Sequence, residues 1–340
     1  MQGLQNLGST CAVNSLIQII CRTSHLRNII LNTKMQPNTL SNELKEILDM
    51  MHNKGHSLCP RKFVKQLYQH LDVFRLGEQI DIGELWMFLF DKLASEQEIC
   101  IDVPRHQTIS LDNLQIIDNE SLSTSKDLII HCDQTIAKMN NNKTSKWLES
   151  SQGIMLGIIQ CDKCNHTLYN FEPFISIPLD IPEDFEETSP PSPPSISVMF
   201  RNYLKPQKCN GDWKCDKCNE MTDYTKLMKL WKMPQVLTFI IKRFTTISMK
   251  NNKPIHINKN MYIKSGSILC DPSSQISYTC SSFALHFGNL QGGHYCCVCK
   301  VDDKNIFYDD LNISVLDTDI VEKQHANNRD AYMIVYSSCV

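Results

Sequence analysis

The sequence predicts an α+β protein, and two observations support that fold class. Apolar residues recur at helical spacing through the first hundred residues, whereas short runs rich in β-branched and aromatic residues dominate from residue 153 onward. A third observation, two C-x-x-C pairs in the β-rich part, predicts a metal-binding ribbon within that part. With 340 residues, 42% of them hydrophobic, the chain is long enough to bury a large core.

Three segments in the N-terminal part are expected to be helices, because their apolar residues fall on one helical face or form a helix-compatible run: residues 12–20, 42–51 and 81–90. Asp81 is suited to cap the last of these helices, and Glu84 stands at the capping-box offset from it. Residues 101–150 are polar and rich in Asn and Ser, so we expect irregular structure there with one short helix.

Four runs in the β-rich part are expected to be strands: residues 174–179, 236–241, 283–286 and 332–336. Between the first two lies an acidic stretch interrupted by prolines, residues 182–197. That stretch is too polar to pack against a core, so we interpret it as a mobile surface loop.

Composition and charge restrict the classes of function. There are 34 basic and 37 acidic residues, giving a net charge of −3, which argues against a binder of nucleic acid or membrane surfaces. No apolar run approaches the ~20 residues that span a bilayer, and the opening residues lack the features of a signal peptide. We therefore expect an intracellular protein, cytoplasmic or nuclear, whose 16 cysteines serve as metal ligands, a nucleophile and core residues rather than disulfides.

The two C-x-x-C pairs are Cys161 with Cys164 and Cys215 with Cys218, and each pair lies within the same five letters, CDKCN. Each pair can present two thiolates to one tetrahedral Zn²⁺, so together they predict a Cys₄ site. Four protein ligands leave no open coordination position, and the predicted zinc is therefore structural. Cys209, shortly before the second pair, is an alternative ligand.

Cys11 is the candidate nucleophile. It follows a loop rich in glycine and polar residues and directly precedes the first predicted helix. The positive end of the helix dipole and the unpaired N–H groups at a helix N-terminus favour a thiolate over a thiol. The alternative is that Cys11 is a small buried hydrophobic residue, as most free cysteines are.

A cysteine nucleophile needs a base, and the base needs an orienting partner. His294 follows two glycines that would let a substrate backbone pass closely, and Asp309 comes after one further predicted hairpin. There Asp309 could accept the second ring N–H of His294. Taken singly, the histidine could be structural and the aspartate part of a turn, but the order Cys, His, Asp is that of papain-type peptidases.

Together these motifs make the chain resemble the catalytic domain of the ubiquitin-specific protease (USP) family over nearly its whole length. The pattern GLxNLGxTC at residues 3–11 resembles the family's Cys box, and QxDxxEL at residues 79–85 resembles its glutamine/aspartate box. HxGxxxxGHY at residues 286–295, with YDD at residues 308–310, resembles its His box. The zinc pairs also lie where the family carries them.

The resemblance implies a papain-like cysteine peptidase fold with the thumb, palm and fingers arrangement of this family. The thumb is expected to be helical and to cover residues 1–105. The palm is expected at residues 106–152 and 233–340, and the zinc-bearing fingers are expected at residues 153–232.

The resemblance also implies an activity, hydrolysis of the peptide or isopeptide bond after the C-terminal Gly-Gly of ubiquitin. Cys11 would be the nucleophile, His294 the base and then the acid, and Asp309 the residue that orients His294. Asn6 would donate its side-chain amide to the oxyanion. Asp310 is the alternative to Asp309, because adjacent acids can share such a role.

Five residues match positions that hold the extended ubiquitin tail in this family: Gln79, Asp81, Glu84, His286 and Tyr295. Carboxylates suit that tail because it carries arginine, and carboxylate–guanidinium pairs can be bidentate. The implied partners are ubiquitin or ubiquitinated proteins, without nucleic acid or membrane. We expect a monomer that holds structural Zn²⁺.

Five positions depart from the family pattern: Ala12, Val13, Ile80, Gly83 and Asn305. None of these changes removes a catalytic group, but they alter the expected channel for the tail. Two alternatives to a ubiquitin protease therefore remain, a protease for another ubiquitin-like modifier and a catalytically weak ubiquitin-binding pseudoprotease. A nucleic-acid-binding zinc ribbon is disfavoured by the negative net charge.

Overall fold

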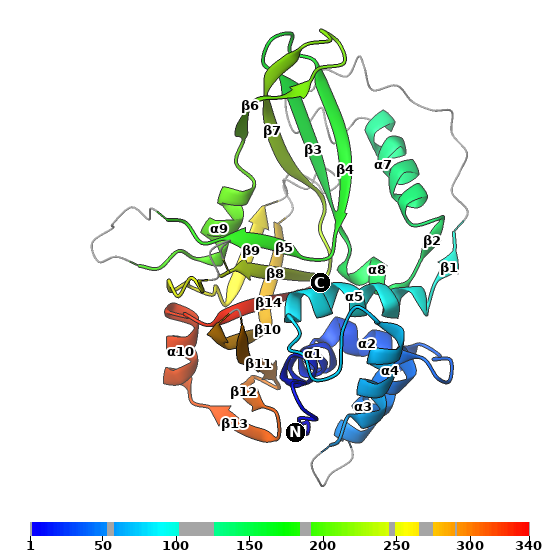
Figure 1. Ribbon diagram of the computed structural model, residues 1–340, viewed down its shortest axis with the longest axis vertical. Helices are drawn as coiled ribbons and strands as arrows, with labels where there is room; N and C mark the ends of the chain where they lie inside the picture. Colours follow the sequence, from blue (N-terminus) through cyan, green and yellow to red (C-terminus); the bar gives the residue numbers. More distant parts are fainter. Residues whose placement is uncertain are drawn as a thin grey trace.

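A helical lobe packs against one face of an eight-stranded sheet, and a separate four-stranded sheet extends away from both (Figure 1). The computed structural model describes residues 2–52, 58–101, 126–183, 192–244, 249–264, 275–289 and 291–339. Its mixture of helices and mainly antiparallel strands confirms the predicted α+β class.

Among the described residues, five helices form the lobe: α1 (Cys11–Arg22), α2 (Ser24–Asn32), α3 (Leu40–His52), α4 (Arg61–His70) and α5 (Ile82–Ser95). Helix α1 is buried at every position from Cys11 to Cys21, which is the pattern of a helix at the centre of a core. Asp81 caps α5, because its Oδ1 accepts the backbone N–H groups of Gly83 at 2.8 Å and Glu84 at 3.0 Å. The three predicted helices are confirmed as α1, α3 and α5.

The prediction of one short helix within residues 101–150 is wrong. Two helices, α7 (Lys126–Met139) and α8 (Lys146–Ser151), follow residues 102–125, which lie outside the described residues. They form because each buries a few apolar side chains in a mostly polar sequence. In α7 these include Leu128 and Cys132, and in α8 Trp147 is fully buried. A small ladder of β1 (Ile99–Cys100) and β2 (Lys143–Thr144) joins this region to the end of the lobe.

The eight-stranded sheet has the order β13-β12-β11-β10-β14-β8-β5, and β9 also pairs with β10. In chain order its strands are β5 (Ile177–Asp180), β8 (Val236–Lys242), β9 (Asn260–Lys264), β10 (Gln275–Asn289), β11 (Gly292–Val301), β12 (Lys304–Asp309), β13 (Asn312–Leu316) and β14 (Ala331–Ser338). All pairs are antiparallel except β5 with β8. The strands predicted at residues 236–241, 283–286 and 332–336 are confirmed within β8, β10 and β14.

The four-stranded sheet has the order β4-β3-β7-β6. Its strands are β3 (Gly153–Cys161), β4 (Thr167–Phe174), β6 (Gln207–Lys214) and β7 (Met221–Lys232). The stretch 153–232 also supplies β5 and α9 (Ile196–Tyr203), which pack with the eight-stranded sheet. Of the acidic stretch at residues 182–197, predicted to be a loop, residues 184–191 lie outside the described residues. Residues 182–183 and 192–194 belong to no helix or strand, whereas the last two residues of the stretch already belong to α9.

A single strand over residues 174–179 is a wrong prediction, because the chain passes from one sheet to the other within that run. Strand β4 ends at Phe174 in the four-stranded sheet, and β5 begins at Ile177 in the eight-stranded one. Pro178 is tolerated in β5 because this is an edge strand, where a missing N–H need not face a partner.

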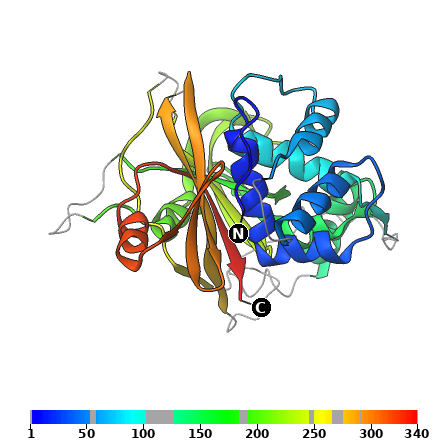
Figure 2. The same ribbon diagram turned by 90° about the horizontal axis from the view of Figure 1, so that it is seen from below.

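The eight-stranded sheet separates two cores. Along β14, Met333 and Val335 pack with the helical lobe, whereas Ile334 and Tyr336 pack on the opposite face, as alternation along a strand requires. Viewed from below, the sheet stands between the lobe and α10 (Thr318–Ala326) (Figure 2). Within the described part of the chain, no helix has the length and apolar character needed to span a bilayer.

Candidate active site

Cys11 is the first residue of α1, and its side chain is only 4% exposed. The preceding loop bends through Gly8 and Ser9, which have φ values of 96° and 54° in the left-handed region. Asn6 holds this loop together, because its Oδ1 accepts the backbone N–H groups of Gly8 at 3.0 Å and Thr10 at 3.2 Å. The loop therefore fixes both the thiol and the Asn6 amide.

Burial raises the pKa of the Cys11 thiol above its ordinary value. Backbone N–H groups of Tyr295, Ala12 and Cys11 itself favour the thiolate, and the charge of Asp310 disfavours it. The predicted direction of the effect of the helix N-terminal N–H groups is therefore confirmed, but their effect on the Cys11 pKa is smaller than that of burial. Desolvation outweighs the N–H groups, so deprotonation of Cys11 requires a base.

His294 and Asp309 lie on the neighbouring strands β11 and β12, and their side chains are in contact. The Nε2 atom of His294 lies 2.6 Å from Oδ1 of Asp309. Both side chains remain partly exposed, at 40% and 36%. Because Nε2 is engaged by the carboxylate, Nδ1 is the ring nitrogen left for another group. Cys11 lies beside this pair, since its sulfur faces the backbone N–H of Tyr295, the next residue after His294.

Asp310 has a different set of partners from its neighbour. It adopts a left-handed φ of 50°, which turns its carboxylate toward the helical lobe. There Oδ2 accepts from Nδ2 of Asn6 at 2.8 Å, and Oδ1 accepts from Nδ2 of Asn14 at 2.7 Å. Of the two candidates that the sequence left open, Asp309 therefore contacts His294, whereas Asp310 holds Asn6.

Asn14 was not assigned a role by sequence reasoning, although it lies close to the Cys box. It is buried on a helix whose other residues are mainly apolar, which is the signal that could have marked it. Its Nδ2 also donates to the backbone carbonyl of Leu4 at 3.3 Å. Asn14 thus joins α1 to the N-terminal segment and to Asp310.

Gln79 and Asp81 connect the helical lobe to the strand that carries His294. The side-chain amide of Gln79 donates to the carbonyl of Gly293 at 2.5 Å and accepts its N–H at 2.6 Å. Oδ2 of Asp81 accepts from the hydroxyl of Tyr295 at 3.4 Å, in addition to the helix-capping bonds of Oδ1. Glu84 lies in the first turn of α5 and is exposed.

His286 and Tyr295 lie side by side in a group of aromatic rings, 4.6 Å apart between ring centroids. Phe244 and Tyr332, which sequence reasoning did not assign to the site, complete the group at 5.5 Å and 6.2 Å from His286. Burial lowers the pKa of His286, so the ring is kept neutral. A side chain at Gly293 would collide with Nε2 of His286, so only glycine fits there.

The five positions that depart from the family pattern have structural explanations in part. Ala12, Val13 and Ile80 are buried in the core of the helical lobe. At Gly83, a Cβ would lie 3.0 Å from Oδ1 of Asp81, so glycine allows the capping carboxylate a close approach. Asn305 lies on β12, where its backbone pairs in register with β11, and it is not part of the site.

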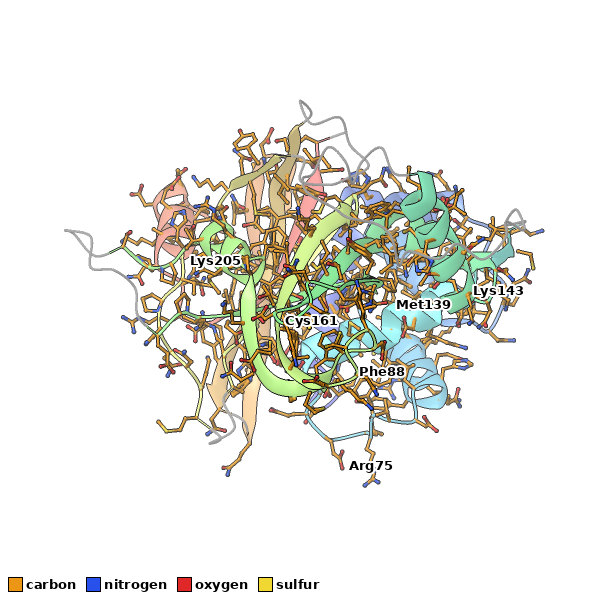
Figure 3. All side chains as sticks on the ribbon, turned by 90° about the horizontal axis from the view of Figure 1, so that it is seen from above. Arg75, Phe88, Met139, Lys143, Cys161 and Lys205 are labelled. Atoms are coloured by element: carbon orange, nitrogen blue, oxygen red, sulfur yellow. The ribbon has the colours of Figure 1, made fainter. Side chains whose placement is uncertain are left out.

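The four predicted zinc ligands meet at one end of the four-stranded sheet, where β3 ends at Cys161. Figure 3 looks onto this sheet from above and labels Cys161. Their sulfur atoms all lie within 4.8 Å of one another. Two pairs are closer, Cys161 with Cys218 at 3.9 Å and Cys164 with Cys215 at 3.6 Å. Tetrahedral coordination with Zn–S bonds of about 2.3 Å requires sulfur separations of about 3.8 Å. This cluster can therefore hold a metal ion.

The two C-x-x-C pairs fold into the same turn. The N–H of Asn165 donates to the carbonyl of Cys161 at 2.9 Å, and the N–H of Asn219 donates to that of Cys215 at 2.8 Å. Both asparagines have a φ of 56°. Cys209 lies outside the four-cysteine group and pairs across β6 and β7 with Tyr224.

Comparisons with known proteins agree with this fold. A family model described as ubiquitin carboxyl-terminal hydrolase matches residues 2–336. Ubiquitin carboxyl-terminal hydrolase 4 of Saccharomyces cerevisiae is 24% identical over 379 residues, which cover 98% of this chain and 39% of the yeast protein. Ubiquitin carboxyl-terminal hydrolase 4 of Arabidopsis thaliana is 22% identical over 359 residues, which cover 99% of this chain and 93% of the plant protein.

A solved structure is similar over the whole chain. It is the SAGA DUB module, Ubp8 with Sgf11, Sus1 and Sgf73, bound to monoubiquitin. It matches with a TM-score of 0.70 at 17% identity and covers 100% of this chain and 69% of that chain. This likeness confirms the predicted fold class. The chain spans well under half the length of the yeast relative.

Proposed function

The chain belongs to the ubiquitin carboxyl-terminal hydrolase family, and from this premise we propose that it is a thiol-dependent deubiquitinating peptidase. Its substrates are ubiquitin conjugates, cleaved after the C-terminal Gly-Gly of ubiquitin. The observation that carries the proposal is the juxtaposition of Cys11 with a His294–Asp309 pair 2.6 Å apart. Relatives with this family's name and a similar structure bound to monoubiquitin support the choice of substrate.

In the proposed reaction, His294 takes the proton of the Cys11 thiol on Nδ1 while Asp309 holds Nε2 and stabilises the imidazolium. The Cys11 sulfur then attacks the carbonyl carbon of the terminal glycine. His294 returns the proton to the leaving amine, which leaves a thioester on Cys11. A water molecule, deprotonated by His294, hydrolyses the thioester and releases the ubiquitin carboxylate and the thiol.

The oxyanion of each tetrahedral intermediate is stabilised by hydrogen-bond donors fixed before the reaction. Asn6 is the side-chain donor, and Asp310 holds its amide group at 2.8 Å. The first backbone N–H groups of α1 add the positive end of the helix dipole. Because the raised pKa of Cys11 keeps the free thiol protonated, the proposed enzyme depends on His294 for its nucleophile.

The ubiquitin tail would pass between the helical lobe and the strand that carries His294. Gly293 has no side chain, and a Cβ there would collide with Nε2 of His286, so only backbone borders the proposed path of the Gly-Gly end at this position. The exposed carboxylate of Glu84 is available for an arginine of the tail, whereas Asp81 is also engaged by the helix cap and by Tyr295. Gln79 is paired with Gly293 in the free chain, so the entering tail would exchange with these bonds.

We further propose that the four-cysteine cluster holds Zn²⁺. Its sulfur separations of 3.6 and 3.9 Å suit tetrahedral coordination, and four thiolates are a common ligand set for structural zinc. The ion would fix the ends of β3 and β6 and complete no catalytic step.

Hydrolysis of ubiquitin with a C-terminal fluorophore, and of isopeptide-linked di-ubiquitin, tests the proposed function. We expect turnover by the full chain, none by the Cys11→Ser variant, and full activity in Cys59→Ser, which changes an exposed cysteine. A higher kcat/KM for another modifier ending in Gly-Gly would contradict the choice of ubiquitin. Ubiquitin binding without turnover of any such substrate would establish a pseudoprotease and overturn the enzymatic proposal.

A further inference from the structure

Cys296 is a thiol next to the proposed catalytic pair that the mechanism does not use. It lies two residues after His294 on β11, so both side chains point to the same face of the strand. Cys297 pairs in register with Tyr308 of the adjacent strand, which places Cys296 opposite Asp309. The sheet therefore brings a histidine, a cysteine and an aspartate to one place.

These three side chains present a metal-ligating set. A ring nitrogen of His294, the sulfur of Cys296 and a carboxylate oxygen of Asp309 all lie within 4.8 Å of one another. Cys296 is only 2% exposed and forms the floor of the group, whereas the other two side chains are partly exposed. An ion could thus reach the thiol from the solvent side.

The donor set and spacing fit Zn²⁺. Imidazole nitrogen, thiolate and carboxylate are its usual protein ligands, and tetrahedral coordination requires donor separations of about 3.3 to 3.6 Å. The Nε2 of His294 and Oδ1 of Asp309 are now 2.6 Å apart, so they would separate slightly around the ion. Three protein ligands leave the fourth position to water.

We propose that His294, Cys296 and Asp309 form an inhibitory Zn²⁺ site, separate from the four-cysteine cluster. On binding, the Cys296 thiol loses its proton to solvent and the sulfur coordinates the ion. Zn²⁺ on Nε2 of His294 leaves the ring proton on Nδ1, because a neutral imidazole carries only one. His294 then cannot accept the proton of Cys11. The inhibition rests on the proposed function, whereas the metal site does not.

Cobalt binding tests the site without reference to activity. The 340-residue chain, with its four-cysteine cluster first filled with Zn²⁺, is titrated with Co²⁺, which binds protein ligands less tightly than Zn²⁺ and leaves the cluster filled. We expect one Co²⁺ per chain and a thiolate-to-cobalt charge-transfer band. The band should disappear in Cys296→Ala but persist in Cys299→Ala, a matched control because Cys299 is buried on the same strand outside the group.

Further variants keep this result decisive. Cys11→Ala should retain the band, and its loss there would overturn the proposal by assigning the ion to the nucleophile. If Cys296→Ala does not fold, His294→Ala should bind Co²⁺ at least tenfold more weakly. No band in the wild-type protein, or an unchanged band in Cys296→Ala, would also overturn the site.

Inhibition of ubiquitin hydrolysis by Zn²⁺ tests the consequence, with each variant compared to its own metal-free rate. We expect the inhibiting concentration to rise at least tenfold in Cys296→Ala and to stay unchanged in Cys299→Ala. Cobalt binding by a protein that hydrolyses no ubiquitin substrate would refute the proposed function and leave the site standing. Hydrolysis without metal binding would refute the site alone.

Discussion

Removal of the Asp310 carboxylate tests whether Asp309 and Asp310 have different functions. The carboxylate accepts from Asn6 at 2.8 Å and from Asn14 at 2.7 Å, and no hydrogen bond that the structure gives it involves His294. The variant Asp310→Gly deletes these bonds while tolerating the φ of 50°, at which alanine would be strained. We expect this variant to impair the oxyanion donor and to leave the His294–Asp309 pair intact.

The size of the effect follows from what still holds Asn6. One oxyanion donor contributes ~2.7–4 kcal/mol to transition-state stabilisation. In the variant, Oδ1 of Asn6 keeps its bonds to Gly8 and Thr10, so the amide is loosened rather than lost. We therefore expect a partial loss of about 1.4–2.7 kcal/mol, or 10- to 100-fold in kcat. Each hydrogen bond to the charged carboxylate contributes ~1.5–3 kcal/mol, so the free energy of unfolding should also fall by a few kcal/mol.

Steady-state hydrolysis of fluorogenic ubiquitin, with thermal unfolding in parallel, measures both effects. Asp303→Gly is the matched control, because Asp303 has a φ of 62° and a side chain that is 96% exposed. It should change neither kcat nor stability. In a double-mutant cycle, Asp310→Gly should cost little further activity once Asn6 is alanine. Additive losses, or a pH profile for Asp310→Gly that matches Asp309→Ala, would refute the assignment of Asp310 to Asn6.

Three further predictions concern stability and ionisation. Arg243 is fully buried and donates to four backbone carbonyl groups. Arg243→Met should therefore lower the free energy of unfolding, measured by urea titration, by ~3–5 kcal/mol. A loss below ~1 kcal/mol would contradict this prediction. Cys161→Ser should cause misfolding or aggregation rather than a purely kinetic defect, and unchanged thermal stability of zinc-free protein would argue against a structural ion. Because burial raises the pKa of Cys11, the free thiol is protonated at neutral pH. Its alkylation by iodoacetamide should therefore accelerate as pH rises beyond the ordinary cysteine pKa of ~8.5. An alkylation rate that is already constant from about pH 6 to 8 would disprove the raised pKa.

The sequence predicted those elements whose burial is visible in a local pattern. Helix α1 and strands β8 and β14 are of this kind, because each carries a mainly apolar run. Helix α7 was missed because its stabilising contacts are distant, since Leu128 packs with Phe171 and Trp231 of the four-stranded sheet. The passage between sheets after Phe174 was missed for the same reason, because strand propensity does not specify a partner strand.

The same distinction between local patterns and distant contacts applies to the candidate site. The four-cysteine cluster could be predicted because C-x-x-C turns fix two ligands locally. The different partners of Asp309 and Asp310 could not, because they depend on one left-handed residue at the end of β12. The direction of the Cys11 pKa shift was also beyond the sequence, since it follows from burial against β11.

Reaction of the folded chain with ubiquitin that carries a C-terminal electrophile tests most directly whether Cys11 is the nucleophile. The modified peptide is then identified by mass spectrometry. We predict a single adduct on Cys11, absent from Cys11→Ala and retained in Cys59→Ser, whose altered residue is exposed. Folded protein that forms no adduct, or that is modified at another cysteine instead, would contradict the account.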